Sequence, residues 1–203
     1  MSGRRGWIKI CGLTSSESVT AAMEAGADAI GFVFAASPRR ITAAEAARLA
    51  GPARGHLRCV AVFKHPSAIE VNEVLDVLDP DIVQTDHVDA ARLPQRAIAR
   101  FLPVYRESGP LPTNPPRRLL FEGISSGSGR TADWNIARSL TGTTELVLAG
   151  GLGTENVVEA IRTVRPFGVD VSSGVEISPG IKSVQRIHDF VRAARAAFEE
   201  LTV

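Results

Sequence analysis

The sequence is poor in several features, and each shortage argues against a class of protein. Its 203 residues include two cysteines, 5% aromatic side chains and a formal net charge of +1. Two cysteines are too few for the disulfide framework of a small secreted domain, so we expect Cys11 and Cys59 to be free thiols. A charge so close to zero gives no electrostatic reason to expect nucleic acid or an anionic membrane as partner.

Long apolar runs are also missing. No stretch is long enough to cross a bilayer. Residues 1–6 carry two arginines with no apolar segment behind them, which argues against a secretory signal. We therefore expect a cytoplasmic protein. With 44% hydrophobic residues, a chain of this length buries one sizeable core, so a single domain over residues 1–203 is expected.

What the sequence does contain is a regular alternation of short apolar runs and helical stretches. The expected strands are 7–11, 29–34, 57–63, 81–85, 102–105, 118–122, 146–149 and 168–171. The expected helices are 17–26, 43–54, 68–78, 89–100, 133–140, 154–164 and 183–201. Runs such as 30–34 and 146–149 are apolar throughout, which is typical of strands buried on both faces of a parallel sheet.

Eight such units predict an α/β fold, a closed (βα)8 TIM barrel, with an open doubly wound sheet as the alternative. No GxGxxG follows the first strand, so the dinucleotide-binding version of the open sheet loses support. The stretch 106–116 contains four prolines, which forbid a regular helix. We therefore expect a minimal barrel whose fifth helix is replaced by a loop.

Candidate functional residues stand where these strands end. Cys11 closes the first strand, at a strand-to-helix junction where barrel enzymes keep their chemistry, although a cysteine there equally often only packs. The loops after the seventh and eighth strands are rich in small residues and offer Gly150, Gly151, Ser172 and Ser173 for phosphate binding. These loops predict a small-molecule phosphorylated substrate.

Other polar residues follow the second, fourth and sixth strands. Arg39, in the run 37–40, suits a carboxylate, since a guanidinium binds one bidentately. Taken alone, however, such an arginine pair is more often a solvated basic turn. Glu122 ends the sixth strand and suits proton transfer across the barrel mouth. His65, Asp86 and His87 lack metal-ligand spacing, so no metal is expected.

The ordered set of motifs has a family resemblance. The segments that carry it are 9–14 (KICGLT), 26–34 (GADAIGFVF), 37–39 (SPR), 133–134 (DW), 149–157 (AGGLGTENV) and 169–180 (VDVSSGVEISPG). Together they resemble the phosphoribosylanthranilate isomerase family of tryptophan biosynthesis. The family is a (βα)8 barrel whose fifth helix is a loop, in agreement with the proline-rich stretch.

The resemblance implies a reaction and a set of roles. The reaction is the Amadori rearrangement of N-(5'-phosphoribosyl)anthranilate to 1-(2-carboxyphenylamino)-1-deoxyribulose 5-phosphate, without cofactor. Cys11 would be the general base and Arg39 would hold the anthranilate carboxylate. The phosphate would lie on Gly150, Gly151, Ser172 and Ser173. Lys9, on the same side of the strand as Cys11, is a possible substrate contact, as are Asp86 and Asp170.

Two positions depart from the family pattern. The family usually ends the sixth strand with Leu-Leu-Asp, whereas this chain reads Leu119-Leu120-Phe121-Glu122. Aligning the leucines puts Phe121 at the place of the acid, and sliding by one residue puts Glu122 there; Glu122 is the predicted acid. The family usually reads Gln-Leu-His-Gly at 84–87, where Asp86 now either bonds a ribose hydroxyl or caps the next helix.

Two alternative functions remain. One is a bifunctional isomerase that also serves histidine biosynthesis, although such enzymes resemble a duplicated half-barrel and use paired aspartates, and no internal repeat is visible here. The other is a non-catalytic phosphate-binding barrel. We expect no nucleic acid or membrane partner and either a monomer or a homodimer. The run 125–129 has a flexible composition and is a candidate segment for closing over a ligand.

Overall fold

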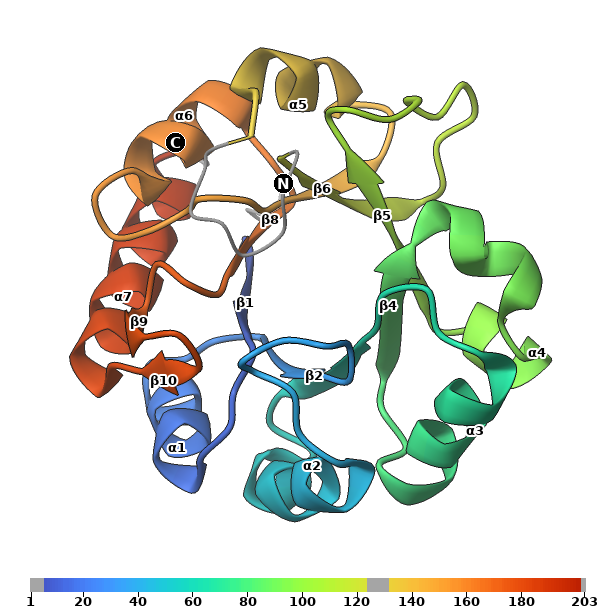
Figure 1. Ribbon diagram of the computed structural model, residues 1–203. Coiled ribbons are helices and arrows are strands. Elements are labelled where there is room, and N and C mark those ends of the chain that lie inside the picture. The colour runs from blue at the N-terminus through green and yellow to red at the C-terminus, as the bar shows by residue number, and fades with distance from the viewer. Residues whose placement is uncertain (1–5, 124–131, 202–203) are drawn as a thin grey trace.

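The computed structural model describes residues 6–123 and 132–201 and consists of a closed barrel of parallel strands within a ring of helices (Figure 1). The barrel strands run in chain order: β1 Trp7–Cys11, β2 Ala29–Val33, β3 Arg58–Val62, β4 Ile82–Asp86, β5 Phe101–Arg106, β6 Arg118–Glu122, β7 Glu145–Leu148 and β8 Gly168–Val171. β8 pairs with β1, with Lys9 opposite Asp170, which closes the sheet. The expected TIM barrel is confirmed.

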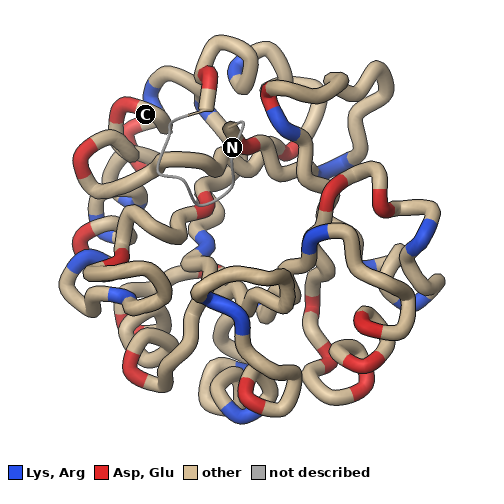
Figure 2. Tube along the Cα trace, in the orientation of Figure 1, with Lys and Arg blue, Asp and Glu red and all other residues tan. Residues whose placement is uncertain are grey.

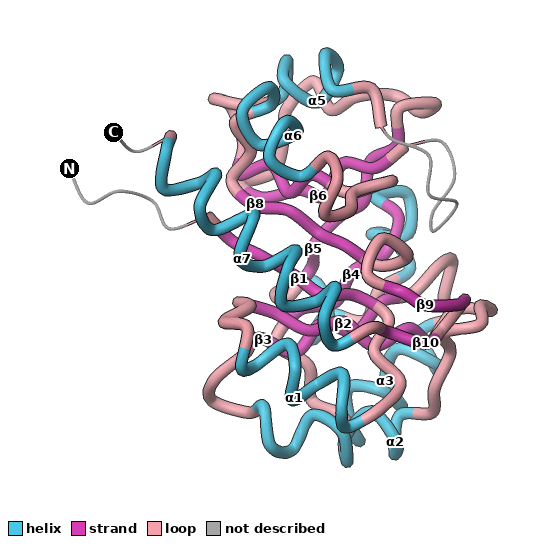
Figure 3. Tube along the Cα trace, turned by 90° about the vertical axis from the view of Figure 1, so that its left-hand side faces the viewer, coloured by secondary structure: helices cyan, strands magenta, loops and turns pink. Residues whose placement is uncertain are grey.

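The helices lie outside the strands (Figure 3). They are α1 Ser16–Glu24, α2 Ala43–Ala50, α3 Ala68–Val77, α4 Gln95–Ile98, α5 Trp134–Leu140, α6 Val157–Val164 and α7 Val184–Glu200. Several begin at side-chain caps: Thr42 and Ser67 form capping boxes with Glu45 and Glu70. Such reciprocal caps satisfy backbone N–H groups that the first turn leaves without partners.

The core has two layers because side chains alternate along each strand. One set points into the barrel and forms an inner cluster of Trp7, Ala29, Val60, Leu102, Val104, Leu120, Val147 and Ala149. The other set points outward and packs under the helices, as Ile8, Ile10, Leu119 and Phe121 do. This alternation decides which residue at each strand end reaches the mouth of the barrel.

Three expectations about local structure were wrong. The helix expected over 89–100 is a 3₁₀ helix, His87–Arg92, followed by the short α4, because Pro94 interrupts the turn. α6 begins at Val157 rather than at residue 154. A hairpin of β9, Glu176–Ser178, and β10, Ile181–Lys182, projects at the end where the barrel strands finish and was not expected (Figure 3).

The fifth crossover matches its prediction, because the chain passes from β5 to β6 without a helix. The run 125–129 lies outside the described residues. Among the helices that the structure describes, none combines the length and the apolar character needed to cross a bilayer. Lysine, arginine, aspartate and glutamate positions are mixed around the whole circumference of the barrel (Figure 2), as expected from the balanced charge.

Candidate active site

A pocket of about 230 Å³ opens where the barrel strands end, and it gathers most of the predicted site residues. The predicted residues that line it are Cys11, Arg39, Glu122, Gly150, Gly151, Asp170, Ser172 and Ser173. Lys9 and Asp86 are buried and lie outside this lining. Residues from the first, second, sixth, seventh and eighth βα units therefore converge on one pocket.

Cys11 and Lys9 occupy the inward side of β1. Lys9 is fully buried, and its Nζ donates to Asp170 Oδ1 at 2.9 Å. Gly31 on β2 leaves room for both, since a Cβ there would lie 3.0 Å from Lys9 Cε and 3.1 Å from Cys11 Sγ. Burial raises the pKa of Cys11, although the Lys9 charge works in the opposite direction. Burial thus works against the thiolate form of Cys11, and Lys9 is the neighbour that most favours it.

The two cysteines are both free, as predicted, but their surroundings differ. Burial raises the pKa of Cys59 to about 12, and Cys59 packs in the outer core cluster, whereas Cys11 lines the pocket. We expect iodoacetamide to label Cys11 slowly at neutral pH and faster as the pH rises past 9.0, the ordinary pKa of the thiol, because the thiolate is the nucleophile. Cys59 should stay unlabelled in the native protein.

Mass spectrometry of the alkylated peptides measures this difference. Labelling of the unfolded chain is the control, since both thiols then react alike. Equal labelling of the two cysteines in the native protein would contradict the structure.

Phe121 and Glu122 lie on opposite sides of β6. Phe121 is completely buried on the outer side of β6, within the cluster under the helices. Glu122 comes next on the strand, so its side chain turns inward and lines the pocket. The carboxyl of Glu122 thus occupies the place at which an acid on β6 reaches the mouth of the barrel.

Arg106, at the end of β5, holds Glu122 and was not anticipated from the sequence. Its Nη1 lies 3.0 Å from Glu122 Oε2, and its Nη2 donates to Asp86 Oδ1 at 2.5 Å. Asp86 makes no capping hydrogen bond to the 3₁₀ helix that follows it, so the capping alternative for this residue was wrong. The sequence shows only a basic residue near the end of the fifth strand; its proximity to two acidic residues is tertiary.

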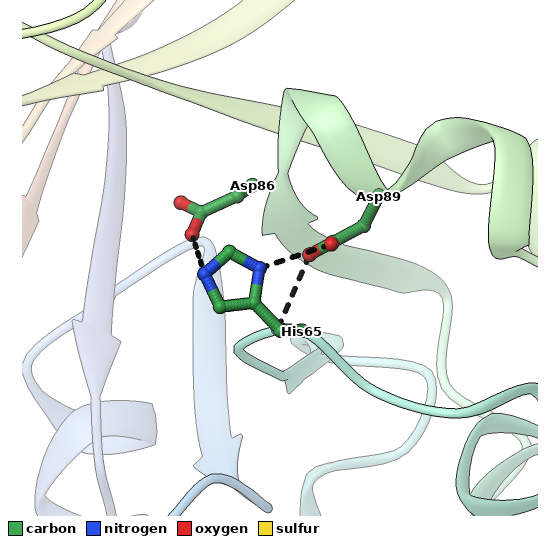
Figure 4. A group of neighbouring side chains, drawn as sticks. All are labelled: His65, Asp86 and Asp89. Atoms are coloured by element: carbon green, nitrogen blue, oxygen red, sulfur yellow. Dashed lines mark hydrogen bonds and ion pairs between the residues drawn. The ribbon is translucent and has the colours of Figure 1, made fainter.

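Behind Asp86 stands His65, which follows β3 (Figure 4). His65 Nε2 lies 3.4 Å from Asp86 Oδ2, and Nδ1 lies 3.0 Å from Asp89 Oδ1. The ligand atoms of these three residues lie within 4.8 Å of one another, a spacing that a metal ion also uses. However, both ring nitrogens face carboxylates and Arg106 already binds Asp86, so hydrogen bonds and ion pairs account for the cluster.

Arg39 is anchored by Glu176 at the edge of the pocket. Arg39 Nε and Nη2 donate to the two carboxylate oxygens of Glu176 at 2.7 and 2.8 Å. Lys182 Nζ donates to Glu176 Oε1 at 2.8 Å from the other side. Burial alone would raise the pKa of Glu176, but the hydrogen bonds from Arg39 and Lys182 outweigh it and the pKa is lowered. The carboxylate thus fixes the Arg39 guanidinium where the pocket opens.

The loops after β7 and β8 form a cradle of small residues at the pocket. Gly150 and Gly151 have φ values of 89° and 64°, which favour glycine. Asn156 fixes this loop, accepting from the Gly153 N–H at 2.9 Å and donating to Gly151 O at 2.8 Å. Ser172 Oγ donates to Cys11 O at 3.1 Å. The cradle and the thiol are therefore parts of one structure.

Gln84 on β4 is a further pocket residue that the sequence did not single out. Its side chain lines the pocket, and Oε1 is buried without a hydrogen-bond partner among the described residues. A buried acceptor that lacks a donor costs free energy unless a ligand supplies one. The pocket thus presents an open acceptor as well as cationic and thiol groups.

Fold and pocket together define an enzyme of the (βα)8-barrel class, with a thiol, a carboxyl group and a cradle of glycine and serine residues in one cavity. A family model described as N-(5'-phosphoribosyl)anthranilate isomerase matches residues 8–193. The chain belongs to this family of intramolecular aldose–ketose isomerases of tryptophan biosynthesis.

Individual relatives align with this chain over almost its full length. The chain is 37% identical to N-(5'-phosphoribosyl)anthranilate isomerase of Pelobacter propionicus, covering 96% of this chain and 98% of the relative. Among solved structures, the Thermus thermophilus isomerase superimposes with a TM-score of 0.81 at 30% identity, covering 96% and 99%. Another isomerase structure, in complex with reduced 1-(o-carboxyphenylamino)-1-deoxyribulose 5-phosphate, has a TM-score of 0.75 at 30% identity, covering 94% and 99%.

Proposed function

We propose that this chain converts N-(5'-phosphoribosyl)anthranilate to 1-(2-carboxyphenylamino)-1-deoxyribulose 5-phosphate, with Cys11 as general base and Glu122 as general acid. The observation that carries the proposal is that Cys11, Glu122 and the glycine and serine loops line one pocket. The phosphorylated sugar would anchor in the loops, so that its first two carbons lie between thiol and carboxyl group.

The proposed sequence of steps uses both groups. Glu122 donates its proton to the ring oxygen as the bond between this oxygen and C1 breaks, which gives an open-chain Schiff base. The Cys11 thiolate then removes the proton from C2, which gives an enolamine. Cys11 returns this proton to C1 as the C2 hydroxyl gives its proton to the Glu122 carboxylate, so the C2 ketone forms and both groups return to their starting states. Positioned acid and base groups each contribute about 10²–10⁴-fold to such proton transfers. Lys9 supports the thiolate through its buried positive charge.

Substrate binding is assigned to the two ends of the pocket. Gly150, Gly151, Ser172 and Ser173 would take the phosphate through backbone N–H groups and hydroxyls. Arg39, fixed by Glu176, would take the anthranilate carboxylate. Asp170 lines the pocket and its first role is to hold Lys9.

The Arg39 assignment predicts a binding defect. We expect Arg39→Lys to raise KM about tenfold or more with a smaller loss of kcat, because an ammonium cannot bind Glu176 and a substrate carboxylate in the same planar geometry. Steady-state kinetics measure both constants. Arg96→Lys, in an exposed ion pair with Asp76 at 2.6 Å, is the matched control and should change neither. An unchanged KM in Arg39→Lys would contradict the assignment.

The decisive test of the function is a direct assay. The purified protein should isomerise N-(5'-phosphoribosyl)anthranilate and should restore growth of a tryptophan auxotroph that lacks the isomerase. It should leave the aminoaldose of histidine biosynthesis unchanged. Phosphate binding without turnover would support a non-catalytic barrel instead.

The oligomeric state needs a separate measurement. Light scattering decides between monomer and homodimer; one Thermotoga maritima relative is described as dimeric.

A further inference from the structure

Arg106 joins the two positions at which this chain departs from the family pattern. Its guanidinium contacts Glu122 Oε2 on β6 at 3.0 Å and Asp86 Oδ1 on β4 at 2.5 Å. The Asp86 and Glu122 side chains are only 10% and 11% exposed. Two largely buried carboxyl groups on different strands therefore share one cation.

Asp86 is held from its other side. His65 Nε2 lies 3.4 Å from Asp86 Oδ2, and the His65 backbone N–H and Nδ1 are both bound by Asp89, at 3.2 and 3.0 Å (Figure 4). Thr85 Oγ1 donates to Asp89 Oδ2 at 2.7 Å. His65 itself has a φ of 50°, a backbone conformation that needs such support outside glycine. The imidazole is thereby fixed behind Asp86.

The Arg106 charge bears on whether Glu122 can hold a proton. A general acid must carry its proton, yet an arginine beside a carboxyl group favours the charged form. The Asp86 carboxylate gives the Arg106 cation a second partner, so that the guanidinium is neutralised without the charge of Glu122. We propose that Asp86 is a positioning residue that takes up the charge of Arg106 and so allows Glu122 to hold the proton it donates, with His65 fixing Asp86. This inference rests on the proposed acid role of Glu122.

The remaining charged groups around the pocket come from other strands. Lys64, Arg39, Cys11 and Asp170 line it, with Lys9 bound to Asp170 at 2.9 Å. The end of β7 contributes Ala149 and Gly150, which carry no charge. Arg106 contacts Glu122 directly, with Nη1 3.0 Å from Oε2.

The test removes the charge of Asp86 and keeps its shape. In Asp86→Asn, the Glu122 carboxyl should lose its proton at a pH lower by about one unit, since the Asp86 charge then no longer offsets the Arg106 charge beside Glu122. NMR of protein labelled with ¹³C-glutamate follows this titration, with the Glu122 signal assigned by its loss in Glu122→Gln. At pH values where Glu122 of Asp86→Asn is mostly ionised, kcat of this variant should be about tenfold below that of the wild type. KM should change less than about threefold.

A double variant separates charge from structural damage. Arg106→Gln alone should raise the pH at which Glu122 loses its proton. Asp86→Asn combined with Arg106→Gln should recover most of the kcat that Asp86→Asn loses, because the Arg106 charge that acts on Glu122 is then removed as well. Structural damage would instead add up in the double variant. Asp76→Asn, which removes the same charge from an exposed ion pair with Arg96, is the control and should leave kcat and the Glu122 titration unchanged.

The outcomes distinguish this inference from the proposed function. A Glu122 titration that does not respond to Asp86→Asn, or an additive double variant, would overturn the inference while leaving the acid role intact. Normal turnover in Glu122→Gln would overturn the acid role, and with it the catalytic part of the inference, whatever the titration shows. Should Asp86→Asn not fold, His65→Asn, which removes the support behind Asp86, should shift the Glu122 titration in the same direction by a smaller amount.

Discussion

Glu122→Gln is expected to lower kcat by about 10²–10⁴-fold with little change in KM. The amide preserves the shape of the side chain and loses the proton that opens the sugar ring. Glu122 lines the pocket and is held by Arg106 at 3.0 Å, so its removal affects a group aimed at the substrate. Steady-state kinetics measure the loss, and circular dichroism shows whether the fold is kept.

Two further variants test whether the loss of kcat is specific to Glu122. Glu200→Gln removes a carboxylate from an exposed ion pair with Arg162 at 2.7 Å and should leave kcat unchanged. Phe121→Ala should instead cost about 3–5 kcal/mol of unfolding free energy, the usual effect of emptying a buried aromatic position, because Phe121 is completely buried under the helices. Turnover near the wild-type rate in Glu122→Gln would show that another group donates the proton.

Cys11→Ala should lower kcat by about 10²–10⁴-fold, since it removes the proposed base for the C2 proton. Cys11→Ser should be nearly as slow, because a hydroxyl is a much weaker acid than a thiol and does not ionise beside Lys9. Exchange of the C2 hydrogen into solvent provides a second measurement. It should stop in both variants even if the sugar ring still opens at Glu122.

Cys59→Ala is the matched control for Cys11→Ala. Cys59 is 3% exposed and packs in the outer core cluster. Its removal should reduce stability by about 1–2 kcal/mol, a value typical of a small buried side chain, and leave kcat unchanged. If Cys11→Ala kept near-normal turnover and C2 exchange, the thiol would be only a packing residue, and the base would have to be sought elsewhere.

The barrel itself was predictable from local signals. Eight short apolar runs alternate with helical stretches, and β1, β6 and β8 begin and end as expected. The proline-rich stretch 106–116 predicted a crossover without a helix. Where prediction failed, the cause was also local: Pro94 divides the expected helix over 89–100. The β9–β10 hairpin was missed because two very short strands carry little periodicity.

The site was only half predictable. The sequence alone placed Cys11, Arg39 and the loops with Gly150 and Ser172 at strand ends, because parallel strands in a barrel finish on one side. It predicted Glu122 rather than Phe121 as the acid, because a phenyl ring cannot donate a proton. The inward or outward direction of a strand residue depends on the register in which the strand joins its neighbours, so only the tertiary structure showed that Glu122 lines the pocket.

The contacts made by Glu122 could not be predicted from the sequence. Arg106, Asp86 and His65 come from three different βα units, and nothing in their spacing announces that they meet. Long side chains contact the groups that lie near them in space, and the closure of the barrel sets the distances between residues of different strands. The sequence thus determined the fold and the strand ends that carry the chemistry. The tertiary structure decided which carboxyl group enters the pocket and which charges surround it.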